Sequence, residues 1–180
     1  MELLDIFDED MNKIGVEERK VVHEKGLWHI HVGVWMMNQE GKILLQKRSS
    51  TKNPNPNKWT RTGGHVESGE TPLIGIQREV EEEVGVKIPE NKFELISVEK
   101  EEANETNRNF IYSYFSYVDY KIEDYTMQKE EVGELKYITI EEVENAQKEN
   151  DKNYTFINWN KEKFNQTILI LKQKRDKMSH

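Results

Sequence analysis

The sequence from residue 64 to residue 86 reads GHVESGETPLIGIQREVEEEVGV, and it is the most informative segment of the chain. It predicts a helix, because Thr71 can cap the helix and Pro72 fits the first position, where a missing N–H costs nothing. Gly85 is predicted to end the helix. At about 100° per residue, four apolar residues fall within one arc and form the expected core face. They are Leu73, Ile76, Val80 and Val84.

Three glutamates of this predicted helix share the adjoining face. Glu79, Glu82 and Glu83 stand at positions i, i+3 and i+4, whereas Glu81 points to the far side. Like charges at that spacing repel, and we expect no basic residue at a neighbouring turn of that face to neutralise them. The arrangement costs stability unless a cation binds, and such hard oxygen ligands suit Mg²⁺ or Mn²⁺. The alternative for a Glu-rich helix is a solvated surface.

The same stretch matches in full the signature of the Nudix hydrolases, G-x5-E-x7-R-E-U-x-E-E-x-G-U, where U is aliphatic. Seven fixed residues, each matched by chance at about one in ten, make coincidence rarer than roughly one in a million. The chain therefore resembles that family. The resemblance implies an α/β class, a Nudix-type α/β/α sandwich with a mixed β-sheet. We expect a single Nudix domain over residues 1–180, with a C-terminal helix at about 159–176.

The resemblance also implies a chemistry, the metal-dependent hydrolysis of a diphosphate linkage in a nucleoside diphosphate-X or related organic diphosphate. A diphosphate repels a nucleophilic water until cations such as Mg²⁺ or Mn²⁺ screen its charge. Arg78 resembles the family arginine that orients a catalytic carboxylate, and Glu70 resembles the glutamate that pairs with this arginine. One of the three helix glutamates could serve as general base. The implied metal ligands are Glu79, Glu82, Glu83 and the carbonyl of Gly64.

Other segments are similar to isopentenyl-diphosphate isomerases and their Nudix relatives, namely residues 27–32, 44–49, 58–60 and 63–65. Those isomerases have a catalytic Cys at or beside the position of Gly63, and this chain contains no Cys. They carry a later acidic pair where this chain has Arg108-Asn109-Phe110, and their signature is usually degraded. These departures favour hydrolysis. The alternatives are an isomerase-like activity on prenyl diphosphates and a non-catalytic nucleotide-sensing module.

Three histidines are further candidates. His29 and His31 alternate along a predicted strand and so share one face, and His65 lies beside the signature. In the isomerases, the counterparts of His29 and His65 help to bind metal. The favoured interpretation here is hydrogen-bonded histidines without a metal role, because the acidic co-ligands are missing.

Four residues are predicted to bind substrate, and each has a plainer alternative. Lys47 and Arg48 precede a Pro/Asn-rich loop at 49–58 and could meet a phosphate, although solvated surface charges are equally expected. Glu131 lies where some family members place an auxiliary base, but a surface pair with Glu130 is favoured. The predicted substrate-binding residues are Lys47, Arg48, His65 and Glu131.

The composition limits the partners. The formal net charge of −8 disfavours polyanions, so we expect a small-molecule diphosphate substrate and no nucleic acid polymer. The longest stretch without Lys, Arg, Asp or Glu, residues 26–39, is too short for a membrane span, and no signal peptide is readable. A cytoplasmic location is therefore expected, and a homodimer is possible.

The remaining elements follow from periodicity and turn residues. We expect strands at 3–7, 28–37, 42–47, 93–98, 109–120 and 134–139, and helices at 16–23 and 140–147. Residues 8–15 are expected to be turn-rich.

Overall fold

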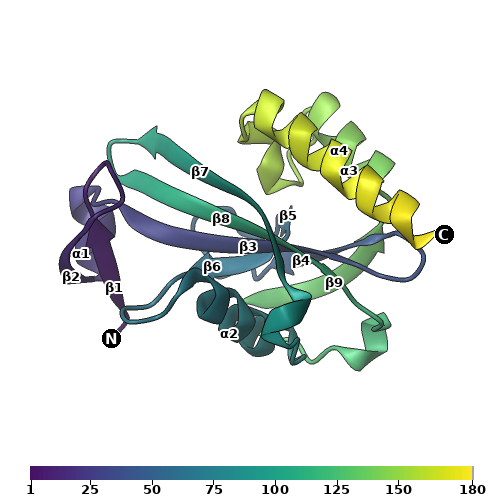
Figure 1. Ribbon diagram of the computed structural model, residues 1–180, viewed down its shortest axis with the longest axis horizontal. Helices are drawn as coiled ribbons and strands as arrows, with labels where there is room; N and C mark the ends of the chain where they lie inside the picture. Colours follow the sequence, from purple (N-terminus) through teal and green to yellow (C-terminus); the bar gives the residue numbers. More distant parts are fainter. Residues whose placement is uncertain (180) are drawn as a thin grey trace. The chain divides into compact units, whose positions relative to one another are not determined.

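The structure, a computed structural model, describes residues 1–179, which form two compact units (Figure 1). The first unit consists of residues 1–34, 63–81 and 87–115. The second consists of residues 35–62, 82–86 and the chain from 116 onward. Whether the chain is one domain, as predicted, stays a prediction.

A small two-stranded sheet opens the first unit. Strands β1 (Leu3–Phe7) and β2 (Lys13–Glu18) pair antiparallel, and helix α1 (Arg19–Lys25) lies beside them (Figure 1). The predicted helix at 16–23 is therefore wrong at its start, and the predicted turn at 8–15 is too long. Because Val16 pairs with Asp5 across the hairpin, the chain stays extended up to Glu18.

The larger sheet of the first unit is formed by β3 (His29–Met37), β6 (Thr62–His65), β7 (Glu94–Asn104) and β8 (Asn107–Tyr117). Strands β7 and β8 pair antiparallel from Glu94↔Phe115 to Asn104↔Asn107. Trp28 stacks on Phe110 with ring centroids 5.0 Å apart, and both side chains are buried. These contacts give the unit an aromatic core between its two sheets.

Helix α2 (Pro72–Val84) has the bounds predicted from the sequence. The Thr71 hydroxyl accepts a hydrogen bond from the Ile74 N–H at 3.2 Å, as a capping residue should. After the helix, Gly85 adopts a φ of +73°, and a Cβ there would lie 2.7 Å from the Thr126 carbonyl oxygen. Glycine is required at this turn for both reasons.

In the second unit, strand β4 (Ile43–Arg48) pairs antiparallel with β5 (Trp59–Thr60), with β9 (Val132–Ile138) and with the end of β3. Residues 50–58 contain no helix or strand, as predicted from the prolines and asparagines of this segment. Helices α3 (Ile140–Lys148) and α4 (Lys161–Met178) lie side by side (Figure 1). Ion pairs join the two helices, including Lys172 with Glu144 at 2.9 Å.

The hydrogen-bonded strand order is β5-β4-β3-β8-β7, with β6 paired to β3 and β9 paired to β4. Short 3₁₀ helices complete the chain at Glu90–Lys92, Ile122–Asp124 and Thr155–Asn158. The predicted α/β class with a mixed sheet is confirmed. Within residues 1–179, none of the helices is both long and apolar enough to span a bilayer.

Candidate active site

Arg78 is the centre of a polar cluster in the first unit. Its Nε donates to Glu70 Oε1 at 2.7 Å, and its Nη2 donates to Glu70 Oε2 at 3.0 Å. The same Nη2 donates to the His65 carbonyl at 3.0 Å. The bidentate pair fixes the guanidinium plane, and the third bond ties it to strand β6. Arg78 and Glu70 thus lie together as the family resemblance implies.

The pKa values in this cluster follow from burial and pairing. Burial raises the pKa of Glu70, but the hydrogen bonds from Arg78 and from the Glu67 N–H, together with the Arg78 charge, hold that pKa below its usual value. Burial lowers the pKa of Arg78, yet the hydrogen bond to Glu70 and the charge of Glu79 raise it overall. Both partners are therefore ionised over the physiological pH range.

Glu79 contacts the same cluster. Arg78 Nη1 donates to Glu79 Oε1 at 3.1 Å. We expected no basic residue to neutralise the glutamates of this helix face, and for Glu79 that expectation is wrong. The long side chain of the adjacent Arg78 reaches the Glu79 carboxylate. A Cβ on Gly64 would overlap the Glu79 carboxylate as it is placed here, so a larger residue at this position would require that carboxylate to move.

The other two helix glutamates belong to the second unit and differ in exposure. Glu82 is exposed, whereas Glu83 is only 7% exposed. Gln46 Nε2 donates to Glu83 Oε2 at 2.7 Å, and the Thr62 hydroxyl donates to Gln46 Oε1 at 2.8 Å. Sequence reasoning missed Gln46 and Thr62, because a single polar residue in a strand gives no signal of a partner far along the chain.

A histidine cluster also lies in the first unit, formed by His23, His29 and His65. One possible ligand nitrogen from each residue lies within 4.8 Å of the others. His31 contacts His65, with ring centroids 5.4 Å apart. The sequence indicated His29, His31 and His65 but missed His23, since its helix precedes the strand without any recognisable ligand spacing.

One nitrogen of this histidine cluster is buried without a protein partner. His29 Nδ1 donates to the Leu27 carbonyl at 2.9 Å, because a carbonyl can only accept. His29 Nε2 therefore carries the lone pair, and it is buried with no hydrogen bond. Burial lowers the pKa of His29 to about 4 and holds the pKa of His65 well below its usual value. Both imidazoles are neutral near pH 7, the form that binds metal ions.

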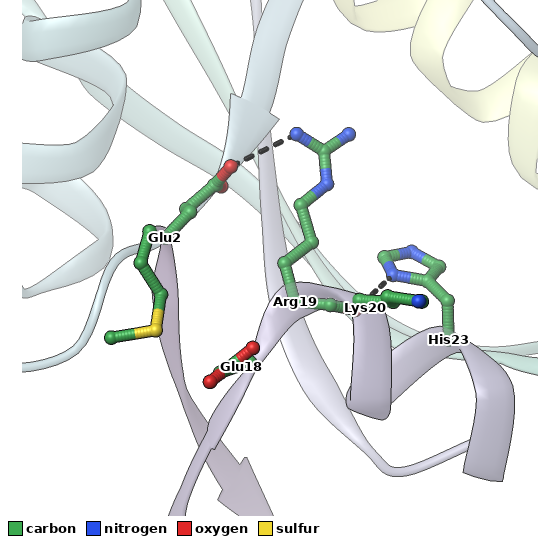
Figure 2. A pocket seen from close by; sticks show the side chains of 6 residues that line it. Glu2, Glu18, Arg19, Lys20 and His23 are labelled. Atoms are coloured by element: carbon green, nitrogen blue, oxygen red, sulfur yellow. Dashed lines mark hydrogen bonds and ion pairs between the residues drawn. The ribbon is translucent and has the colours of Figure 1, made fainter.

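A pocket of about 430 Å³ adjoins this cluster at His23 (Figure 2). Its polar lining carries both signs of charge, and Arg19 is paired with Glu2 at 2.9 Å. His23 Nδ1 lies 2.9 Å from the Arg19 carbonyl, so the short helix fixes the imidazole at the pocket wall. The pocket is lined by Met1, Glu2, Glu18, Arg19, Lys20 and His23.

The predicted phosphate-binding residues of the second unit make contacts within the protein. Lys47 lies 3.8 Å from Glu134, and Arg48 Nε donates to the Pro54 carbonyl at 3.1 Å. Glu131 pairs with Lys52. The contacts of Arg48 and Glu131 hold the 49–58 loop. A role in substrate binding stays a prediction for each of the three residues.

Comparisons with known proteins identify the family of this chain. A family model described as "NUDIX domain" matches residues 27–159. The chain is 39% identical over 149 residues to an uncharacterized Nudix hydrolase of Clostridium acetobutylicum, covering 79% of this chain and 72% of that protein. It is 36% identical over 163 residues to Nudix hydrolase 3 of Arabidopsis thaliana, covering 85% of this chain and 21% of the plant protein.

The chain belongs to the Nudix family, and it is a Nudix hydrolase, an enzyme class that acts on pyrophosphate bonds. Isomerase similarity is partial: the isopentenyl-diphosphate isomerase of Serratia proteamaculans is 35% identical over 85 residues, 47% of this chain and 48% of that enzyme.

Solved structures agree on the fold. The crystal structure of DR0079 from Deinococcus radiodurans has a TM-score of 0.66 at 24% identity, covering 79% of this chain and 86% of that one. The NUDIX domain of NrtR from Shewanella oneidensis, solved with ADP ribose, has a TM-score of 0.54 at 17% identity, covering 64% and 75% of the two chains. Divalent metal ions are general in this family.

Proposed function

We propose that this chain hydrolyses a diphosphate linkage in a nucleoside diphosphate-X or a related small organic diphosphate, with Mg²⁺ or Mn²⁺ as cofactor. The observation that carries the proposal is the intact signature, in which Arg78 binds Glu70 through two hydrogen bonds and contacts Glu79. The Glu79 side chain is only 12% exposed, so it is not a solvated surface group.

The donor set fits a divalent cation of the Mg²⁺ type. Glu79, Glu82 and Glu83 lie on one continuous α-helix at spacings that share a face. Carboxylates and the Gly64 carbonyl are hard oxygen ligands, which Mg²⁺ and Mn²⁺ prefer. When bound, the ion would screen the diphosphate charge and favour deprotonation of the attacking water.

The chain's own residues then have distinct roles. Glu70 fixes Arg78, and Arg78 orients the Glu79 carboxylate. One of the three helix glutamates would take the proton of the attacking water as general base. Lys47, Arg48, His65 and Glu131 remain the proposed contacts to substrate.

The test is a release assay over nucleoside triphosphates, nucleotide sugars, dinucleoside polyphosphates, coenzymes and prenyl diphosphates, with metal or with chelator. Glu82→Gln and Glu83→Gln keep the side-chain shape and remove a charge, so we expect turnover to fall by about 10² or more. Glu81→Gln is the matched control, because Glu81 is exposed and pairs with Lys87 at 3.4 Å. Full activity in both variants, or activity that survives chelation, would contradict the proposal.

The histidine cluster favours a second proposal, a separate site for a transition-metal ion such as Zn²⁺. Three imidazoles, each with a ligand nitrogen within 4.8 Å of the others, offer a suitable ligand set, and the buried, unpartnered His29 Nε2 is the observation that favours it. Co²⁺ titration, read by visible absorption, tests this site. Binding should be lost in His65→Ala and retained in the Glu82→Gln, Glu83→Gln double variant. A wild-type protein that binds no Co²⁺ would refute it.

A further inference from the structure

Gln46 is a buried polar residue at the end of an apolar run. It follows Ile43, Leu44 and Leu45 in β4, which are at most 1% exposed, and is itself only 4% exposed. A buried amide costs stability unless both of its ends are hydrogen-bonded. Here both ends are bonded, to Glu83 and to Thr62, and all three side chains are buried.

The chemistry of the three groups fixes the direction of each bond. An ionised Glu83 carboxylate can only accept, so the Gln46 amide must turn its NH₂ toward Oε2. Its carbonyl oxygen then faces Thr62, whose hydroxyl must donate. The opposite amide orientation would place two oxygen atoms against each other at 2.7 Å. The line Thr62–Gln46–Glu83 therefore directs an N–H donor at the Glu83 oxygen Oε2.

The helix end does not need this side-chain bond to stay in place. The Gln128 N–H donates to the Glu83 carbonyl at 3.0 Å, and the Thr126 N–H donates to the Val84 carbonyl at 3.0 Å. These backbone bonds anchor the last turn of α2 to the segment before β9. The bond from Gln46 adds something else, because it fixes the rotation of the Glu83 carboxylate plane.

We infer that Gln46 is a positioning residue for the hydrolytic reaction, holding Glu83 Oε2 so that the carboxylate is preset for the divalent ion, and that Thr62 acts through Gln46. The inference rests on the proposed function of Glu83. Preset ligands bind a metal more tightly than mobile ones, because less side-chain entropy is lost on binding. Charge-assisted hydrogen bonds are also among the stronger ones in proteins.

The experiment compares Gln46→Met, which keeps length and apolar volume but cannot donate, with the wild type. Mg²⁺ alone is titrated against the melting temperature, and kcat and KM are measured with the diphosphate that the wild type hydrolyses fastest. We expect the Mg²⁺ concentration at half-maximal shift to rise about tenfold. We expect kcat to fall about tenfold to a hundredfold, with KM changed by less than about threefold.

Thr62 variants separate positioning from packing. Thr62→Val removes the hydroxyl at constant shape and should change both readouts in the same direction by a smaller factor, about threefold to tenfold. Thr62→Ser keeps the hydroxyl and should restore both. The double variant with Gln46→Met should be no worse than Gln46→Met alone, because Thr62 acts only through that amide. If Gln46→Met does not fold, this Thr62 pair still decides the question.

Gln147→Met is the matched control. Gln147 is a buried glutamine of the same unit, 7% exposed, and its Nε2 donates to the Phe156 carbonyl at 3.2 Å. This variant should lose stability but keep the Mg²⁺ midpoint and kcat. The inference is overturned if Gln46→Met keeps both within twofold of wild type, or if Gln147→Met changes both as strongly. Full activity in both Glu82→Gln and Glu83→Gln would instead overturn the proposed function itself.

Discussion

Two polar clusters of the first unit differ in whether protein groups satisfy their hydrogen bonds. In the Arg78 cluster, the guanidinium binds Glu70 at both oxygens and also contacts Glu79 and the backbone. In the histidine cluster, the His29 Nε2 is buried and has no hydrogen bond. Buried polar groups are normally satisfied, so the first cluster is a finished support for a carboxylate. The second is incomplete without a ligand or a water molecule.

The largest effect should come from breaking the completed cluster. Arg78→Ala leaves the carboxylates of Glu70 and Glu79 without their cation, and the Arg78 side chain is only 20% exposed. We expect a loss of about 3 kcal/mol in the free energy of unfolding and about 10² or more in turnover. Arg78→Lys should be intermediate, since it keeps the charge but not the bidentate geometry. Denaturant unfolding and steady-state rates measure both, and a wild-type-like Arg78→Ala would remove the distinction between the clusters.

The second-largest effect should be a loss of stability at low pH, which comes from the histidine cluster. The pKa of His29 falls from its usual 6.5 to about 4 through burial, so the unfolded chain binds more protons between these values. Its contribution to stability is complete above pH 6.5 and is lost as the pH falls toward 4. His29→Asn keeps a donor to the Leu27 carbonyl but does not titrate, so it should lose about 2 kcal/mol less between pH 7 and pH 4.5.

Unfolding free energies of wild type and His29→Asn, measured with chelator present, test this second effect. The many carboxylates that titrate in this range are common to both proteins and cancel in the difference. If the unfolding free energies of the two proteins fell in parallel with pH, protonation of His29 would cost the folded state no stability, which would contradict the prediction.

The smallest effect should come from a half-buried ion pair. Lys52 and Glu131 form an ion pair with side chains 23% and 31% exposed, and salt and water screen such pairs. Glu131→Gln should cost less than about 1 kcal/mol in unfolding free energy. Turnover should stay within about threefold, because a Glu131 that only forms an ion pair takes no proton from the attacking water. A tenfold loss of turnover at unchanged stability would favour the auxiliary-base role for Glu131.

Local signals allowed the sequence to predict α2 in full. Thr71, Pro72 and Gly85 mark the helix ends through backbone chemistry that needs no distant partner. Strand β2 was missed because its register depends on pairing with β1, where Val16 faces Asp5, and not on an apolar alternation of its own.

The supports of the site were harder to predict than the site itself. The carboxylates follow from spacing within one helix, whereas Gln46 bonds to Glu83, and Thr62 bonds to Gln46, from other parts of the chain. His23 joins His29 and His65 only through tertiary packing, which brings its ring centroid to 5.1 Å from each of theirs. Contacts of this kind are set by tertiary packing, which a single sequence does not display.

The binding of a divalent ion by the helix glutamates can be tested without a substrate, by melting temperature. A divalent ion that binds the folded state adds about 1.4 kcal/mol at ten times its dissociation constant, a rise of roughly 3 to 5 °C in melting temperature. We expect this rise for the wild type with Mg²⁺ or Mn²⁺, and its loss in the Glu82→Gln, Glu83→Gln double variant. The metal-free double variant should melt at or above the metal-free wild type, because like-charge repulsion is relieved. A wild type indifferent to both ions, or a double variant that keeps the whole rise, would show that these glutamates do not form the divalent-ion site.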